Sequence, residues 1–504
     1  MEPIWSPSSE RIERAQLTRF MQFVRERHRA PVPDYLALHR WSVEYPEKFW
    51  SAVWDFCDVR AQRRATQVIA DGHRMPGARW FVGARLNYAQ NLLRRCDDAP
   101  AVIAHDCGGS RREFTWARLH AETARVAAGL RSAGVTAGER VVGWLPNTPE
   151  AVVAMLATTS VGAVWCCFPP QLGERAALER LRSIKPRVLF VSDRIACPAP
   201  RLLAESGAAR LVIVSSLTPR TSADAVEYEA FGRPGFHLEF AQLPFDAPAF
   251  IACPGEGGDA RCLIHSAGGA LLQHLKDHVL HADLGVGDRY LHHTSCGEVA
   301  WCSLTGALAA GATIVLWDAP DPPDGRELWR ICAQERVNVL GVSCALLDAC
   351  ARSGLRPRGE FDLSALRTLI CSGAPVGADI HKYVYSDVND DVLLEYAAGG
   401  PHVMGSFATG CPIQAVYERE VQCLSLGMKA EALDEHGRPT IDRPGELVCS
   451  EPFPSLPLGL WGDADGEHFR AAYFHRRPDA WRSGAVATIT RRGSVLMHAP
   501  VAKR

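Results

Sequence analysis

Short apolar runs alternate with amphipathic stretches from about residue 100 onward. The spacing predicts helices over 118–130, 150–158 and 175–184, with strands over 140–145, 163–167 and 188–191. After residue 263 the alternation resumes, with strand-like runs at 313–317, 337–342 and 368–371. Strands that alternate with helices pair as parallel sheets covered by those helices. The sequence therefore predicts an α/β fold.

The two ends of the chain follow other patterns. Residues 1–95 are rich in Trp, Arg and His and have helix-like spacing, whereas short alternating segments such as 445–450 replace helices after about residue 403. Alternation over a few residues is typical of antiparallel strands. We therefore expect a helical extension, a first α/β subdomain with a connector, a second α/β subdomain and a β-rich part, over 1–95, 96–262, 263–402 and 403–504.

Composition excludes several classes of protein. The formal net charge is -2 over 504 residues, so no charge excess favours a nucleic-acid or membrane-surface partner. The 17 Cys are scattered without a CxxC pair, which indicates buried thiols in a reducing cytoplasm. The uncharged stretch 151–168 contains Thr, Ser and Gly and ends at Pro169, so we interpret it as a buried helix and strand.

Several long stretches resemble one family. Residues 144–165 (WLPNTPEAVVAMLATTSVGAVW) are similar to the helix–strand unit of adenylate-forming enzymes. More narrowly, the resemblance is to acetoacetyl-CoA synthetases, through residues 83–93, 263–289, 424–439 and 445–463. It covers nearly the whole chain. It implies two α/β subdomains and a β-barrel-like subdomain, followed by a small C-terminal domain, and an activity that forms an acyl-adenylate with ATP and magnesium before transfer to CoA.

The segment collinear with the family's phosphate loop has an unusual composition. The family has Ser, Thr and Gly ending in Lys, whereas this chain has CPGEGGDARC over 253–262. Pro254 removes a backbone donor, and Glu256 and Asp259 add negative charge where a polyanion would bind. Arg261 alone has the expected sign. The sequence predicts that this loop does not hold triphosphate in the family's way.

Three further nucleotide elements depart from the family pattern. Pro401 and His402 stand where the resemblance implies Thr and a metal-binding acid, and imidazole is a poor magnesium ligand. Ala485 stands at the ribose-binding Asp. The hinge residues are missing from 498–502, and the sequence ends at Arg504, so we expect the C-terminal domain to be absent. These losses predict an enzyme without ATP, magnesium or another cofactor.

New ionisable residues are expected in the acyl pocket that the resemblance implies. Glu298 and Val299 stand where the family has large apolar side chains. A buried carboxylate needs a partner, and His402 is the predicted acid/base partner of Glu298. Arg261 would steady an anionic group, and His293 would line the pocket. Cys253 is a candidate nucleophile with His402, whereas Cys296, which matches the family, is expected to pack.

Three functions remain open at this point. The first is an ATP-independent enzyme acting by acid/base chemistry (cyclisation, hydrolysis or rearrangement) on an acyl or β-keto acyl group, carried as a carrier-protein or CoA thioester, in specialised metabolism. The second is a non-catalytic scaffold that binds a carrier protein or a synthetase. The third is a residual acyl-CoA ligase. His274, His278 and His281 share one helical face, and we interpret them as structural rather than metal-binding.

Overall fold

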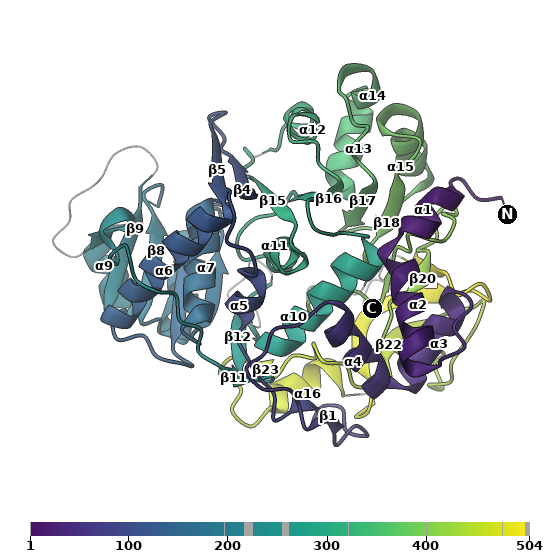
Figure 1. Cartoon of the computed structure of the whole chain (residues 1–504), viewed down its shortest axis with the longest axis horizontal. Helices are drawn as coiled ribbons and strands as arrows, with labels where there is room; N and C mark the ends of the chain where they lie inside the picture. The colour runs from purple at the N-terminus through teal and green to yellow at the C-terminus, as the bar shows by residue number, and fades with distance from the viewer. Residues whose placement is uncertain are drawn as a thin grey trace.

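Two large sheets and their helices make up most of the protein (Figure 1). The computed structural model describes residues 2–195, 197–215, 225–254, 262–320, 322–398, 402–475 and 477–498. Arg261, Glu256, Asp259 and Pro401 lie outside these ranges, as does most of the expected hinge. The α/β expectation is confirmed.

The first large sheet has eight strands in the order β10-β9-β8-β6-β7-β12-β13-β23. Its strands are β6 (Arg140–Trp144), β7 (Val164–Phe168), β8 (Val188–Ser192), β9 (Arg210–Val214), β10 (Val226–Glu227), β12 (Pro248–Ala252), β13 (Leu263–Ser266) and β23 (Gly459–Leu460). Neighbours from β10 to β12 are parallel, and the last two pairings are antiparallel. The covering helices are α6 (Trp116–Ser132), α7 (Pro149–Ser160), α8 (Glu174–Ile184) and α9 (Ala199–Ser206), and the first three confirm the predicted helices to within two residues.

The second large sheet has seven strands in the order β18-β17-β16-β14-β15-β4-β5. They are β4 (Pro100–His105), β5 (Arg111–Thr115), β14 (Arg289–His292), β15 (Thr313–Trp317), β16 (Val339–Ser343), β17 (Thr368–Ser372) and β18 (Leu393–Tyr396), all parallel except for β4–β5. Strands β4 and β5 precede the expected boundary at residue 262, whereas the other five strands follow it. This sheet therefore contains strands from both expected subdomains. The division into four parts remains a prediction.

Helices connect the strands of the seven-stranded sheet. Figure 1 shows α12 (Gly325–Gln334), α13 (Cys344–Arg352), α14 (Pro357–Glu360) and α15 (Ala378–Tyr383) gathered beside strands β16–β18. The others are α10 (Ala267–Leu275), the π-helical turn η2 (Lys276–His281), α11 (Val299–Gly306), the turn η3 (Ala307–Ala310) and the turn η4 (Val384–Val388). Ser266 begins α10, because its hydroxyl accepts a hydrogen bond from the backbone N–H of Gly269.

The β-rich part is a four-stranded antiparallel sheet with helix α16 (Glu467–Tyr473). Its order is β21 (Ala430–Leu433), β22 (Pro444–Cys449), β24 (Trp481–Ile489) and β25 (Val495–His498). A barrel requires its first and last strands to pair. Among the described residues β21 and β25 lie at opposite ends of the sheet, so the expected barrel-like shape is not confirmed.

The N-terminal helices pack against the C-terminal half of the chain. These helices are α1 (Ser9–Arg14), α2 (Gln16–His28), α3 (Tyr35–Glu44) and α4 (Pro46–Phe56), followed by α5 (Tyr88–Leu92). The Tyr35 hydroxyl donates to the Leu424 carbonyl at 2.6 Å, and the Ile4 N–H donates to the Val416 carbonyl at 2.9 Å. Figure 1 shows this purple layer beside the yellow-green β-rich part. The expected helical extension is thus an integral layer of the fold.

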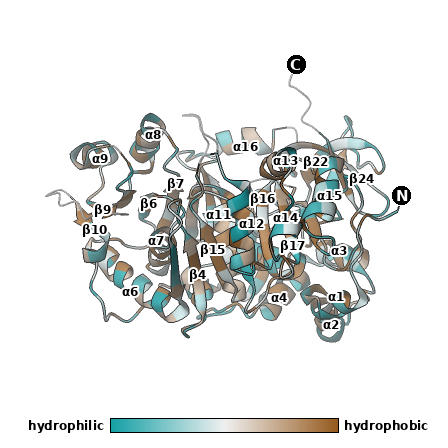
Figure 2. Ribbon diagram, turned by 90° about the horizontal axis from the view of Figure 1, so that it is seen from above, coloured by the Kyte–Doolittle hydropathy of each residue, from teal (hydrophilic) through white to brown (hydrophobic). Residues whose placement is uncertain are grey.

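Short strand pairs complete the described fold. They are β1 (Gln67–Ala70) with β2 (Arg79–Val82), β3 (Arg85–Leu86) with β11 (Leu243–Pro244), and β19 (Ala408–Thr409) with β20 (Cys423–Leu424). Figure 2 shows the central strands near the hydrophobic end of the scale and teal residues on outer helices such as α6 and α12. Among the described residues, no helix combines the length and apolarity that a membrane span needs.

Candidate active site

A cavity of about 1560 Å³ lies where the two large sheets face each other. On one side it is lined by residues that follow β6, β7 and β12, including Asn147, Pro169 and Cys253. On the other side it is lined by the last residues of β14 to β18, namely His292, Trp317, Ser343, Ser372 and Tyr396. The carboxyl ends of parallel strands form the usual binding edge of an α/β sheet. The cavity is therefore the candidate active site.

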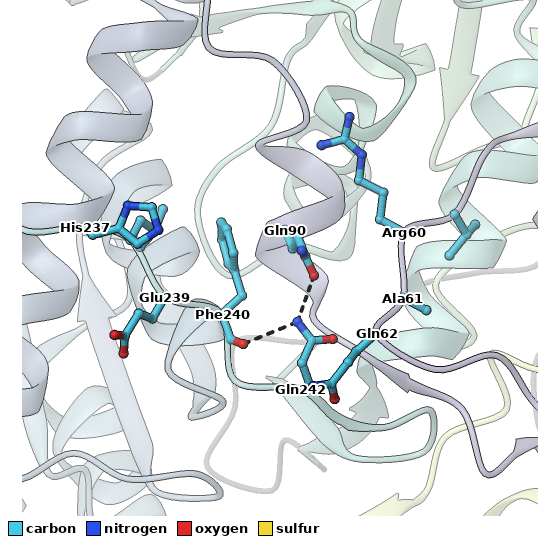
Figure 3. A pocket seen from close by; sticks show the side chains of 10 residues that line it. Arg60, Ala61, Gln62, Gln90, His237, Glu239, Phe240 and Gln242 are labelled. Atoms are coloured by element: carbon cyan, nitrogen blue, oxygen red, sulfur yellow. Dashed lines mark hydrogen bonds between the residues drawn. The ribbon is translucent and has the colours of Figure 1, made fainter.

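A second, more open hollow of about 710 Å³ lies beside α5 and the connector that leads to β11. Figure 3 shows Gln242 donating to the Gln90 side chain and to the Phe240 carbonyl, at 2.8 and 3.3 Å. Arg60 and His237 face it from opposite sides. Since no predicted site residue lines it, we do not treat it as the active site.

Glu298 lines the large cavity at its mouth, immediately before α11. Its carboxylate is exposed and accepts hydrogen bonds from the hydroxyls of Ser295 and Thr294, at 2.8 and 3.2 Å. A solvated carboxylate with two hydroxyl donors needs no buried partner. The physical reason given for pairing it with a histidine therefore does not apply.

His402 points to the β-rich part instead of the cavity. Its Nδ1 lies 2.6 Å from the hydroxyl oxygen of Tyr473 in α16, and the Tyr473 ring stacks on Trp481 with 4.0 Å between centroids. Burial lowers the pKa of His402. The predicted Glu298–His402 pair is thus not assembled in this structure, because a tyrosine 71 residues further along the chain holds the imidazole.

His293 lines the cavity, and its pKa is influenced by the charge of Glu298. Burial lowers the pKa of His293, while the negative charge of Glu298 acts to raise it. The ring lies beside Trp317, with 5.3 Å between centroids. Its neighbour His292 also lines the cavity, so both residues of the pair contribute to the wall.

Cys253 is bonded to Cys262 in a disulfide. Its sulfur is therefore not the thiolate that a nucleophile requires. For these two cysteines the expectation of free thiols is wrong, because antiparallel pairing of β12 with β13 brings their Cα atoms to 4.1 Å. The other 15 cysteines carry free thiols, and Cys296 packs with its sulfur 3.3 Å from the Pro146 carbonyl oxygen. Arg261 lies outside the described residues.

A buried polar group in the cavity wall was not predicted. Tyr290, His292, His278 and Glu395 all line the cavity, and each is at most 6% exposed. The Tyr290 hydroxyl lies 2.7 Å from Nδ1 of His292, and the His278 Nε2 lies 2.7 Å from the Ser303 carbonyl. The available signal was an acid in the apolar strand LLEY, since a buried strand rarely carries an unpaired carboxylate.

Glu395 differs from its neighbours in having an oxygen without a partner. Among the described residues, none forms a hydrogen bond with its buried Oε2. Burial, with smaller contributions from Cys423 and Asp277, raises the pKa of Glu395 to about 8. The carboxyl group is therefore mostly protonated at neutral pH.

Comparisons with known proteins identify the family. The description "AMP-binding enzyme" matches residues 89–456, and "Acetyl-coenzyme A synthetase N-terminus" matches residues 35–92. The chain belongs to the AMP-binding enzyme family. Acetoacetyl-coenzyme A synthetase of Rhizobium meliloti is 36% identical over 98% of this chain and 79% of its own length. Malonamoyl-CoA synthetase of Penicillium aethiopicum is 30% identical over 98% of this chain and 74% of its own length.

A solved structure supports the same family. Acetoacetyl-CoA synthetase from Streptomyces lividans matches 99% of this chain and 80% of its own chain, with a TM-score of 0.94 and 36% identity. The AMP-binding fold is thus retained throughout the aligned length. The expectation that a C-terminal domain is absent gains no support from these comparisons.

These matches overturn the leading functional prediction. An ATP-independent acid/base enzyme is wrong as the main interpretation, because relatives named as CoA synthetases align over nearly the whole chain and the AMP-binding match is continuous from 89 to 456. The prediction weighed a few substituted positions above the whole architecture. The residual acyl-CoA ligase, one of the alternatives, agrees better with the comparisons.

Two described positions test whether a magnesium–nucleotide group of the AMP-binding family fits this chain. His402, at the position of the metal-binding acid, is bonded to Tyr473, and Ala485 has no side-chain oxygen for ribose. The residues present at these two positions therefore do not match that group. His278 and His281 hold the Ser303 and Gly410 carbonyls, which agrees with a structural role.

Proposed function

We propose that this protein is an acyl-CoA ligase that joins a small carboxylic acid to a thiol. The proposal is supported chiefly by the large cavity at the carboxyl ends of β14–β18, within a fold that matches acetoacetyl-CoA synthetase at a TM-score of 0.94. Relatives are named for acetoacetyl and malonamoyl groups, so a short acid with an oxygen-bearing end is the expected substrate. We place the protein in the cytoplasm, in keeping with its many free thiols.

The thiol acceptor is proposed to be CoA, with a carrier-protein thiol as the competing acceptor. The loop after β7 and helix α8 line the cavity with Arg175 and Arg180, and guanidinium groups suit a phosphorylated acceptor. Both acceptors carry a phosphopantetheine arm, so they share this chemistry. No step is assigned to magnesium, because His402 supplies no carboxylate.

The deciding experiment is ATP–pyrophosphate exchange with a panel of short acids, followed by thioester formation with CoA or a loaded carrier protein. We expect acid-dependent exchange and formation of the CoA thioester. A cavity-filling Ala300→Trp variant should lower the rate at least about 10-fold, because Ala300 lines the cavity. Val286→Trp is the matched control, since Val286 is 75% exposed and lies outside the lining. No acid-dependent exchange with any acid would overturn the proposal.

A further inference from the structure

The Cys253–Cys262 disulfide contrasts with the other cysteines of the chain. The remaining 15 cysteines are free thiols, and most of them are buried. A chain with so many free thiols suits the reducing compartment proposed above. In such a compartment a lasting structural disulfide is rare, and a disulfide that does form is usually transient, with a catalytic or redox-sensing role.

The disulfide lies where two antiparallel strands of the first large sheet meet the cavity. Strands β12 and β13 are paired as far as Ala252 and Leu263, and Cys253 and Cys262 are the next residues outward. Cys253 lines the large cavity, and Cys262 is partly exposed. The bond therefore joins the wall of the candidate active site to a residue in contact with solvent.

Backbone contacts hold both cysteines in place independently of the bond. The Trp461 N–H donates to the Cys262 carbonyl at 2.8 Å, and Nη1 of Arg180 donates to the Cys253 carbonyl at 3.4 Å. Because neither contact involves sulfur, the two cysteines stay close to each other when the bond opens, as a reversible exchange requires. The positive charge of Arg180 also favours a thiolate at Cys253.

We propose that the Cys253–Cys262 disulfide is a reversible exchange site for low-molecular-weight monothiols. The thiolate of an incoming monothiol attacks the sulfur of Cys262 and forms a mixed disulfide, while the original S–S bond breaks and Cys253 leaves as a thiolate. A second monothiol attacks the mixed disulfide and releases Cys262. The protein disulfide gains two electrons, the two monothiols become one disulfide, and their two protons end on Cys253 and Cys262.

The test uses the full-length protein in mixtures of reduced and oxidised glutathione that run from strongly oxidising to strongly reducing. After an acid quench, free thiols are alkylated in denaturant and counted by intact mass, and peptide masses locate the bond and any glutathione adduct. We expect the count to rise from 15 to 17, with Cys253 and Cys262 changing together. Far-UV circular dichroism should stay unchanged throughout.

Matched cysteine variants serve as controls. Cys253→Ser and Cys262→Ser should each abolish the paired change, whereas Cys107→Ser, at an exposed free cysteine, should keep it. Three results would each overturn the inference: a bond that survives the most reducing mixture, two thiols that never join in the most oxidising one, and a bond that opens only when the dichroism signal is lost. Thiol counting needs no turnover, so its result is independent of the ligase assay.

A second arm identifies the monothiol. CoA and glutathione at equal concentration reduce the cross-linked protein, and each rate is divided by that with a small linear disulfide. Arg175 and Arg180 line the cavity, so entry through the cavity predicts a ratio about 5-fold larger for the phosphorylated thiol, CoA. An equal or larger ratio for glutathione assigns the exchange to the solvent side. Either ratio supports the exchange site, whereas no reduction by either thiol overturns it.

Discussion

Glu335 and Glu395 are both almost completely buried beside the seven-stranded sheet, at 2% and 4% exposure. Glu335 is surrounded by donors: His105 Nε2 lies at 3.0 Å and Arg111 Nε at 2.8 Å, and Arg289 reaches it at 3.3 Å. Glu395 has an oxygen with no described partner. Burial acts to raise the pKa of Glu335, but hydrogen bonds from His105 and Arg111 outweigh it and bring the pKa to about 2, whereas that of Glu395 rises to about 8.

The difference separates a carboxylate that joins several strands from one whose burial is poorly offset by hydrogen bonds. Glu335 holds together β4, β5 and the start of β14, since its partners come from those strands. Glu395 holds no comparable network, although it lies in the wall of the cavity. A buried group whose desolvation is not offset within the protein destabilises the fold, which is common at binding sites.

The largest expected effect comes from making the same change at both positions. Glu335→Leu should lower the free energy of unfolding by about 2 kcal/mol, because it removes the hydrogen-bond acceptor of the buried His105 and of the partly exposed Arg111 and Arg289. Glu395→Leu should change it by about 1 kcal/mol or less, because the buried Oε2 of Glu395 accepts no hydrogen bond from a described residue. Urea unfolding monitored by circular dichroism measures both. Equal losses at the two positions would contradict the distinction.

A pH series sharpens the comparison. Between the ordinary pKa of 4.5 and the folded value of about 8, the unfolded chain ionises Glu395 while the folded chain keeps the proton. Stability conferred below pH 4.5 is therefore lost as pH rises, by up to about 1.4 kcal/mol per pH unit. Relative to Glu395→Gln, wild type should lose about 2 kcal/mol between pH 5 and 7. A constant difference would argue against a protonated Glu395.

Glu335 should respond in the opposite direction. Its folded-state pKa of about 2 lies below the ordinary 4.5, so its contribution is present above pH 4.5 and is lost as pH falls toward 2. Unfolding measured from pH 6 down to pH 3 for wild type and Glu335→Gln should therefore show convergence of the two curves at the acid end.

The smallest effect is expected at the cavity mouth. Glu298→Gln should change the free energy of unfolding by less than about 0.5 kcal/mol, because Glu298 is exposed and, among the described residues, accepts hydrogen bonds from two hydroxyls. The pKa of His293 should fall, since the charge of Glu298 acts to raise it. An NMR titration of the His293 ring tests this. A rise in that pKa would show that the two groups do not interact as the structure indicates.

Sequence periodicity was sufficient for the sheet layers but not for the site. The apolar runs at 140–145 and 368–371 became β6 and β17, because local hydrophobic pattern sets the strand period. The buried wall of the large cavity combines His278, Tyr290 and Glu395 from three separate elements, and no local pattern specifies that meeting. His402 was assigned to the pocket because the family resemblance places it at the metal-binding acid, yet its imidazole is bonded to Tyr473.

Most of the predicted phosphate loop lies outside the described residues, so that part stays a prediction. One residue at its start is corrected: Cys253 was a candidate nucleophile, whereas strand pairing joins it to Cys262. Charge and hydroxyl counts along a loop describe composition, and binding depends on backbone geometry that such counts do not contain. Overall similarity to synthetases was therefore the better guide to the family than any one substituted position.

The packing of the N-terminal helices against the β-rich part has a consequence during synthesis on the ribosome. The Tyr35–Leu424 hydrogen bond joins residues 389 positions apart. At about 5–20 residues per second, translation would take roughly 20–80 s to deliver the second partner after the first. During that interval the β-rich part is not yet available to pack against the apolar faces of α2 to α4, which include Phe20, Phe49 and Trp50. We therefore expect these helices to bury their apolar faces fully only after the β-rich part has been synthesised.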